Sequence, residues 1–276
     1  MKILFKILAS VLLITISTLV SADISNDPLV PKTESAFAKN FLERAQAKDF
    51  TFVKEQLDAS LIGNVNETSI AEFAKYFPTG KLLSTDLIGS QVNVINDAWQ
   101  GNFTYEYHFE NGWALANAVV NRKDNKLSVM GFNVYPTKAS QKEINKFSLI
   151  DKSILHYLTL LSAILVPIFI LITLVVCIKT PIPRRKWLWI IFILGGISTF
   201  SINWTTGEYG FNLIQYQLLG SGIFSAGEYA PWIIVVGLPL GAILFWFKRE
   251  KWRVTAPIQN TQQESIASSP TEDKKS

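Results

Sequence analysis

Apolar and polar side chains follow three different patterns along this chain. In the first, apolar residues recur three and four positions apart, which is typical of amphipathic helices, and we expect helices over 34–48, 50–60 and 69–77. The second pattern, from Leu82 to Tyr135, alternates in short runs separated by turn residues, which predicts strands. The third, beyond Ser153, consists of long apolar runs without alternation. Helices followed by a meander of strands predict an α+β domain with an antiparallel sheet.

Local signals mark where several of these elements begin and end. Asp49 is placed to cap the second helix, because its carboxylate can accept hydrogen bonds from free backbone N–H groups. Ser69 and Glu72 form a capping box for the third helix, and Pro78 ends that helix. The pair Asn111-Gly112 between two strand-like runs is the strongest short signal for a hairpin turn.

The segment 104–110 shows the alternation most clearly. Tyr105, Tyr107 and Phe109 fall on one face of a strand, and His108 falls on the opposite, polar face. Because successive side chains of a strand point to opposite faces, this pattern predicts a half-buried strand with an aromatic inner face.

Three later segments are apolar enough to cross a membrane, which takes about 20 residues in a helix. They contain no Lys, Arg, Asp or Glu, and we predict transmembrane helices over 153–178, 187–204 and 230–247. A fourth span over 210–226 is the alternative. We expect that segment to lie on the outer surface or to be re-entrant within a connector, 205–229, because a fourth span would place the basic residues after Phe247 outside, against the positive-inside tendency.

The remaining segments complete a predicted domain order. Residues 1–22 have the lysines, apolar stretch and small final residues of a signal peptide, with an uncleaved signal anchor as the alternative. We then expect a linker over 23–33, an exported domain over 34–138, and a juxtamembrane helix over 139–152 that couples this domain to the membrane. After the spans, we expect a basic stretch with a disordered cytoplasmic tail over 248–276. This order predicts a multi-pass protein of a bacterial inner (plasma) membrane, with 23–152 periplasmic or extracytoplasmic and the C-terminus cytoplasmic.

Composition and charge narrow the classes of function. The chain is 49% hydrophobic and only 17% charged, whereas a soluble domain usually has about 25% charged residues. Its net charge of +4 does not indicate a nucleic-acid partner, because residues 23–152 hold 14 Lys and Arg against 16 Asp and Glu. The excess basic residues flank the apolar runs, where they report membrane orientation.

The exported part resembles a known fold. Its helices, closed by FPTGKLL, precede the meander FTYEYHFENGWALANAVVNRKDNKLSVMGFNVYP. In this order of elements, residues 34–137 resemble the NTF2-like (SnoaL-like) cone fold. The resemblance implies three N-terminal helices packed on a curved antiparallel sheet, here followed by an all-α membrane module of three transmembrane helices. That module resembles uncharacterised bacterial membrane proteins. Members of the NTF2-like fold include both enzymes and non-catalytic interaction modules, so the fold does not choose a function.

Candidate chemistry is sparse. We expect aromatic side chains and one histidine to line an apolar ligand pocket, namely Tyr105, Tyr107, Trp113, Phe132 and His108; ordinary sheet core is the alternative for the aromatic residues. Glu106, His108 and Glu110 could hold a metal ion, but their spacing along a strand is wide for one ion, and a solvated polar face is the favoured interpretation. We assign no catalytic residue, no metal site and no cofactor.

These observations favour a membrane-anchored, non-catalytic binding or scaffolding protein. The expected partners are the lipid bilayer and either a protein or a small apolar ligand outside the cytoplasm, with no nucleic acid. A homodimer through the sheet is a further expected contact. The alternative function is an enzyme that acts on a small or lipid-like substrate inside the cone, which requires an apolar cavity with a polar group in it.

Overall fold

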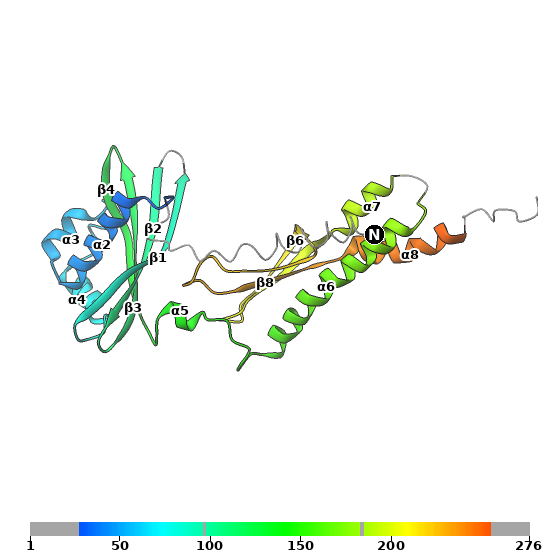
Figure 1. Cartoon of the computed structure of the whole chain (residues 1–276). Helices are drawn as coiled ribbons and strands as arrows, with labels where there is room; N and C mark the ends of the chain where they lie inside the picture. The colour runs from blue at the N-terminus through cyan, green and yellow to red at the C-terminus, as the bar shows by residue number, and fades with distance from the viewer. Residues whose placement is uncertain (1–27, 96–97, 183–184, 255–276) are drawn as a thin grey trace, which may run out of the picture. The chain divides into compact units, whose positions relative to one another are not determined.

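The computed structural model describes residues 28–95, 98–182 and 185–254, which form seven helices and two antiparallel sheets (Figure 1). They divide into two compact units. The described residues up to Ser148, together with Ser225–Trp232, form the first unit, and the described parts of Leu149–Phe224 and Ile233–Ser276 form the second. The predicted signal peptide, the first part of the predicted linker and most of the predicted tail lie outside the described residues.

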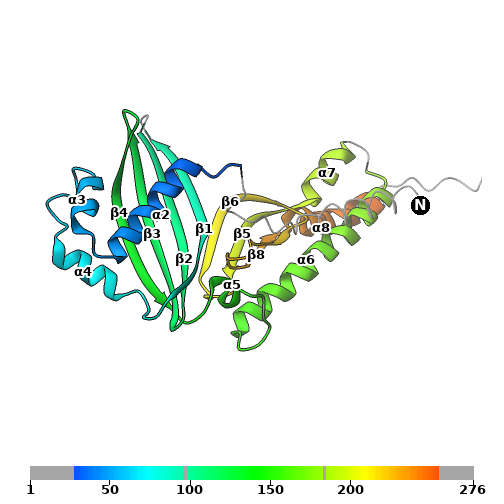
Figure 2. The same ribbon diagram turned by 60° about the vertical axis from the view of Figure 1, so that its left-hand side comes forward.

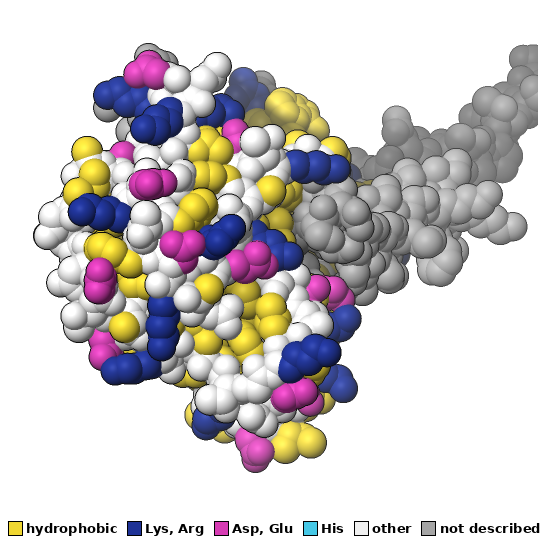
Figure 3. Space-filling view, turned by 90° about the vertical axis from the view of Figure 1, so that its left-hand side faces the viewer, with side chains coloured by type: hydrophobic (Ala, Val, Ile, Leu, Met, Phe, Trp, Pro, Cys, Tyr) yellow, Lys and Arg dark blue, Asp and Glu magenta, His cyan; other side chains and the backbone are white. Residues whose placement is uncertain are grey.

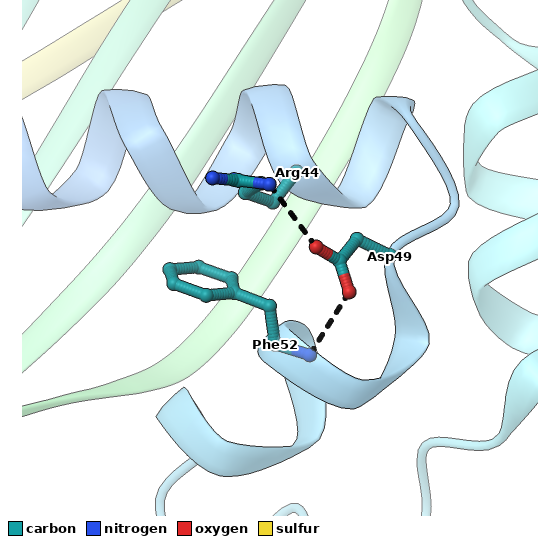
Figure 4. Close-up of polar contacts among 3 residues, drawn as sticks. All are labelled: Arg44, Asp49 and Phe52. Atoms are coloured by element: carbon teal, nitrogen blue, oxygen red, sulfur yellow. Dashed lines mark hydrogen bonds and ion pairs between the residues drawn. The ribbon is translucent and has the colours of Figure 1, made fainter.

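The first unit begins with three helices in the segments expected to be helical, α2 (Lys32–Gln46), α3 (Phe50–Gln56) and α4 (Glu67–Lys75). The predicted cap of α3 is confirmed, because the Asp49 carboxylate accepts the Phe52 backbone N–H at 3.2 Å and contacts the Arg44 guanidinium at 3.3 Å (Figure 4). The start of α4 differs from the prediction. Asn66, not Ser69, is the N-cap, and its side chain accepts the Ser69 backbone N–H at 2.9 Å, so the helix begins almost one turn earlier than predicted.

Four long strands follow as a meander, β1 (Leu82–Ile95), β2 (Ala98–Phe109), β3 (Gly112–Lys123) and β4 (Lys126–Thr137). They pair in the order β1-β2-β3-β4, so β1 and β4 are the edge strands. Register shifts interrupt β1 and the β3–β4 pair. Helix α2 lies across one face of this sheet (Figure 2).

The inner face of the sheet combines large side chains with small ones. On β3 every second residue is a fully buried alanine, Ala114, Ala116 and Ala118. Their partners on β2 are Tyr107, Tyr105 and Phe103. The low alanine row leaves room for α2, whose Phe41 and Leu42 are fully buried. The Phe41 ring meets the Phe132 ring of β4 edge to face, with centroids 5.2 Å apart, an arrangement that aromatic pairs prefer.

On the outer face of the sheet, Glu106 holds the segment that follows β4. This carboxylate is almost fully buried, and it accepts hydrogen bonds from the Ser140 hydroxyl, at 2.8 Å, and from the Gln141 backbone N–H. Both donors lie at the start of the short helix α5 (Gln141–Ile144). A buried carboxylate is stabilised by such donors, since hydrogen bonds to a charged group are stronger than neutral ones.

The prediction of a juxtamembrane helix over 139–152 is wrong, because within this segment only the four residues of α5 are helical. Side chains near α5 instead bind the segment 225–232 of the same unit. The Asn145 amide donates to the Tyr229 carbonyl at 2.7 Å, and the Lys142 ammonium lies 2.6 Å from the Glu228 carboxylate. These contacts favour a short, irregular connection over continuation of the helix.

The second unit consists of three helices and a smaller sheet. The helices are α6 (Ile154–Lys179), α7 (Lys186–Ile193) and α8 (Leu240–Val254). The strands are β5 (Gly195–Asn203), β6 (Tyr209–Leu218), β7 (Ser221–Phe224) and β8 (Ile233–Leu238), in the order β6-β5-β8-β7. A core cluster joins the helices through the buried residues Ile170, Cys177, Ile193, Ala242 and Phe245.

This unit corrects the predicted fold class and localisation. Segment 187–204 forms most of α7 and then β5, segment 230–247 contains β8 and the start of α8, and segment 210–226 contains most of β6 and all of β7. An all-α membrane module of three spans is therefore wrong. Among the described residues, one helix, Ile154–Lys179, is long and apolar enough to cross a membrane, so a multi-pass inner-membrane protein is not supported.

Glycine and proline explain why the two later apolar runs are not continuous helices. A Cβ on Gly196 of β5 would approach the Gly237 backbone of β8 to about 2.9 Å, so the strands meet where a side chain would not fit. Pro239 lies between the end of β8 and the start of α8, a position from which proline can begin a helix but cannot continue one.

Candidate functional site

The five residues predicted to line a pocket lie on two sides of the first sheet. Tyr105, Tyr107 and Phe132 face the helices. His108 and Trp113 are paired across β2 and β3 on the other side, where their rings stack with centroids 3.7 Å apart and planes 5° apart. Because successive side chains of a strand point to opposite faces, Tyr105 and Tyr107 lie on one face of the sheet and His108 on the other. The five residues therefore do not line one pocket.

The space between the helices and the sheet is filled by side chains. The Tyr105 hydroxyl donates to the Ser35 carbonyl at 2.6 Å, and burial raises the pKa of Tyr105 to about 12. The Tyr107 hydroxyl has no hydrogen-bond partner among the described residues, and burial raises its pKa as well. Phe41 occupies the space above the alanine row. The open apolar cavity that catalysis inside the cone requires is not among the described cavities of the first unit.

The acidic and histidine side chains of β2 have separate partners. Glu106 binds the start of α5, His108 stacks on Trp113, and the Glu110 carboxylate accepts the Lys81 backbone N–H at 3.0 Å. Within the described part of the chain, no group of three or more His, Cys, Asp or Glu could hold a metal ion.

An open hollow of about 480 Å³ lies between α4, the loop before it and β4. Its lining is mostly apolar and includes Leu61, Val65, Phe73, Tyr76, Phe132 and Val134. Phe132 contributes one edge of its ring to the core and also lines this hollow. Phe132 is therefore one of two predicted residues that line a described cavity; the other, Trp113, lines a second hollow.

A second open hollow, of about 440 Å³, continues along the same strand. It shares Tyr76 with the first and adds Trp113, Pro136 and Thr137. The two hollows together follow β4 from Gly131 to Thr137, a distance of about 20 Å at 3.3 Å per strand residue. We call this surface the β4 groove.

The outer edge of β4 already pairs with one extended segment. The Val129 carbonyl accepts the Asp58 backbone N–H at 2.9 Å, and Leu57 and Val129 form a parallel β-bridge. Beyond Gly131 no described segment pairs with this edge. An unpaired strand edge offers a row of backbone donors and acceptors to another chain.

The charges around the β4 groove are balanced. Glu72 of the first hollow and Lys75 of the second form an exposed ion pair at 2.5 Å. The face on which α3 and α4 lie shows hydrophobic side chains at the surface among mixed basic and acidic ones (Figure 3). The groove therefore offers apolar contact and backbone hydrogen bonds without a strong field of either sign.

Comparison with family models, with curated proteins and with solved structures found no match for this chain. The resemblance to the NTF2-like fold remains a prediction. Sequence reasoning missed the groove residues Leu61, Val65 and Tyr76. The available signal was Tyr76 itself, a large aromatic residue directly before the buried Phe77 that ends the apolar stripe of α4.

Proposed function

We propose that this protein is a membrane-anchored, non-catalytic binding protein whose β4 groove takes an extended apolar segment of a protein partner. The observation that supports this function best is the unpaired edge of β4 beside an apolar hollow. In strand addition, main-chain hydrogen bonds to a sheet edge provide affinity, and neighbouring pockets select alternate side chains. The β4 groove has both components.

The dimensions and charges of the groove favour a peptide over a small molecule. Both hollows are open and run along the strand, whereas small-molecule sites are concave and bury most of the ligand. A length of about 20 Å fits six or seven extended residues. The paired Glu72 and Lys75 favour an uncharged segment, because neither charge is left to match one on the ligand.

Helix α6 supplies the proposed anchor. It exposes a run of apolar side chains, including Leu158, Leu161, Ile164, Leu165, Ile168 and Ile172. Only 22% of its most apolar stretch is buried, so most of this surface would face water in a soluble protein. Transfer of such surface out of water is favourable by about 25 cal/mol per Å². Contact with a lipid bilayer would remove this surface from water.

Two exposed apolar residues of the first unit test the groove. Tyr76 lines both hollows and is 55% exposed, while Leu83 is 52% exposed on the opposite edge strand, β1, and lines none of the described cavities. A photo-crosslinking amino acid is introduced at either position of the full chain in its host cells. We expect a protein adduct from position 76 and none from position 83. Equal labelling from both, or no adduct from position 76, would contradict the proposal.

A further inference from the structure

Basic side chains gather where the three helices of the second unit meet. The residues are Lys179 at the end of α6, Arg185 and Lys186 at the start of α7, and Lys248 and Arg249 on α8. The Lys186 ammonium donates to the Ile178 carbonyl of α6. The Lys248 ammonium lies 5.6 Å from the centre of the Trp189 ring of α7. These contacts place all three helices at one site, which we call the basic end.

The five positive charges of the basic end outnumber the one described acidic residue beside them, Glu250 of α8. None of the five basic side chains forms an ion pair with a carboxylate within the described part of the chain. Other Lys and Arg side chains do form such pairs, including Lys39, Arg44, Lys75, Arg122 and Lys142. The difference leaves the basic end available to an external anion.

An apolar hollow adjoins these charges. It has a volume of about 500 Å³ and is lined by one face of α7, with Arg185 at one end followed by Leu188, Trp189 and Phe192. The neighbouring side chains Trp187 and Ile191 are largely exposed. A ligand at this position meets a cation first and an apolar surface beyond it.

We propose that the basic end binds the headgroup of an anionic phospholipid, with an acyl chain along the Leu188–Phe192 face of α7. An amphiphile with one anionic head matches a site that is cationic at one end and apolar along its length. Basic residues at a membrane surface attract anionic lipids, and tryptophans favour the same interfacial depth. The inference rests on the proposed membrane anchor and specifies which lipid that anchor selects.

The test measures lipid preference in the intact chain. Full-length protein in a neutral detergent is mixed with equal amounts of phosphatidylglycerol and phosphatidylcholine, and retained lipid is counted by native mass spectrometry. We expect phosphatidylglycerol to dominate. In the double variant Arg185→Gln, Lys248→Gln we expect the preference to fall about twenty-five-fold, since each of the two basic residues near an anionic surface contributes about a factor of five. A preference unchanged in this variant overturns the proposal.

Two controls separate this site from general charge and from misfolding. Lys123→Gln with Lys126→Gln removes the same charge from the exposed β3–β4 turn and should leave the preference intact. Arg185→Lys keeps the cation and should retain most of it. Loss of preference in the turn variant, or displacement of the lipid by inorganic phosphate alone, contradicts a lipid site. The adduct at Tyr76 does not depend on these residues, so failure here is distinguishable from failure of the β4 groove.

Discussion

Strands β2 and β6 both carry several large apolar side chains, yet these side chains have opposite environments. On β2, Tyr105 and Tyr107 are 4% and 0% exposed beneath the helices of the first unit. On β6, Phe211 is 62% and Ile214 is 99% exposed, and almost the whole strand is accessible. An apolar strand therefore becomes part of a core only where a second layer covers it.

The neighbouring strands account for much of this difference. Beside β2, the alanine row of β3 gives α2 a shallow channel in which Phe41 is buried. Among the described strands, β6 pairs only with β5, and its other side is the edge of the sheet. An exposed, uncharged edge strand lacks the charged or proline residues that usually protect such edges.

The largest expected effect is a loss of stability when the packing between α2 and the first sheet is disrupted. Phe41→Ala should destabilise the first unit by about 3–5 kcal/mol, because it removes a fully buried ring and leaves a cavity against Phe132. Ile214→Ala removes a side chain that is 99% exposed and should change stability by less than about 0.5 kcal/mol. Hydrogen exchange of the β2 and β6 amides in the full chain measures both. A comparable loss in the two variants would mean that β6 is covered in solution.

The second test concerns the exposed apolar surface of α6. Leu161→Asp places a charge on the proposed lipid-facing side, which costs about 3 kcal/mol in a membrane helix. We expect alkaline washing to extract the variant from membranes at a lower pH than it extracts the wild type. Leu83→Asp is the control, because Leu83 and Leu161 are both 52% exposed and Leu83 belongs to the first unit. Equal extraction of the two variants would argue against α6 as the anchor.

The smallest effect is a dependence of stability on alkaline pH. Burial raises the pKa of Tyr105 from 10.0 to about 12 in the folded chain. The unfolded chain ionises first, so this stability is complete below pH 10 and is lost as the pH rises towards 12. Tyr105→Phe should lose about 1 kcal/mol at neutral pH with its hydrogen bond and should weaken the alkaline decline. Unfolding midpoints at a series of pH values measure this loss of stability. If stability falls equally in the variant and the wild type, other groups cause the fall.

The sequence predicted the first three helices and the strand meander of the first unit because these elements had local causes. The spacing of Phe37, Phe41 and Ala45 identifies one face of α2, and Asn111-Gly112 gives the β2–β3 turn. The β4 groove was not predictable in this way. It depends on Tyr76 and Gly131 meeting across a gap between a helix and a strand edge, and neither residue belongs to a periodic pattern that indicates a ligand.

The helix predicted over 153–178 is present as α6 (Ile154–Lys179), but the rest of the second unit escaped prediction because its apolar runs have no clear period. Segment 187–204 satisfies the length and composition of a short span, although it divides between α7 and β5. A short apolar run cannot be assigned to helix or strand by periodicity alone. The signals that favoured a strand were Gly195-Gly196 and the Ile, Thr and Ser residues that follow, and they were outweighed by total hydrophobicity.

The alanine row of β3 also limits how this chain can diverge. Any residue larger than alanine at positions 114, 116 or 118 would lift α2 from the sheet, and a smaller aromatic partner on β2 would leave a void. The two strands can therefore change only together. A distant relative with no detectable overall similarity should still show small residues at every second position of one strand and aromatic residues at the paired positions of its neighbour. That two-strand signature is a way to trace the lineage of the first unit.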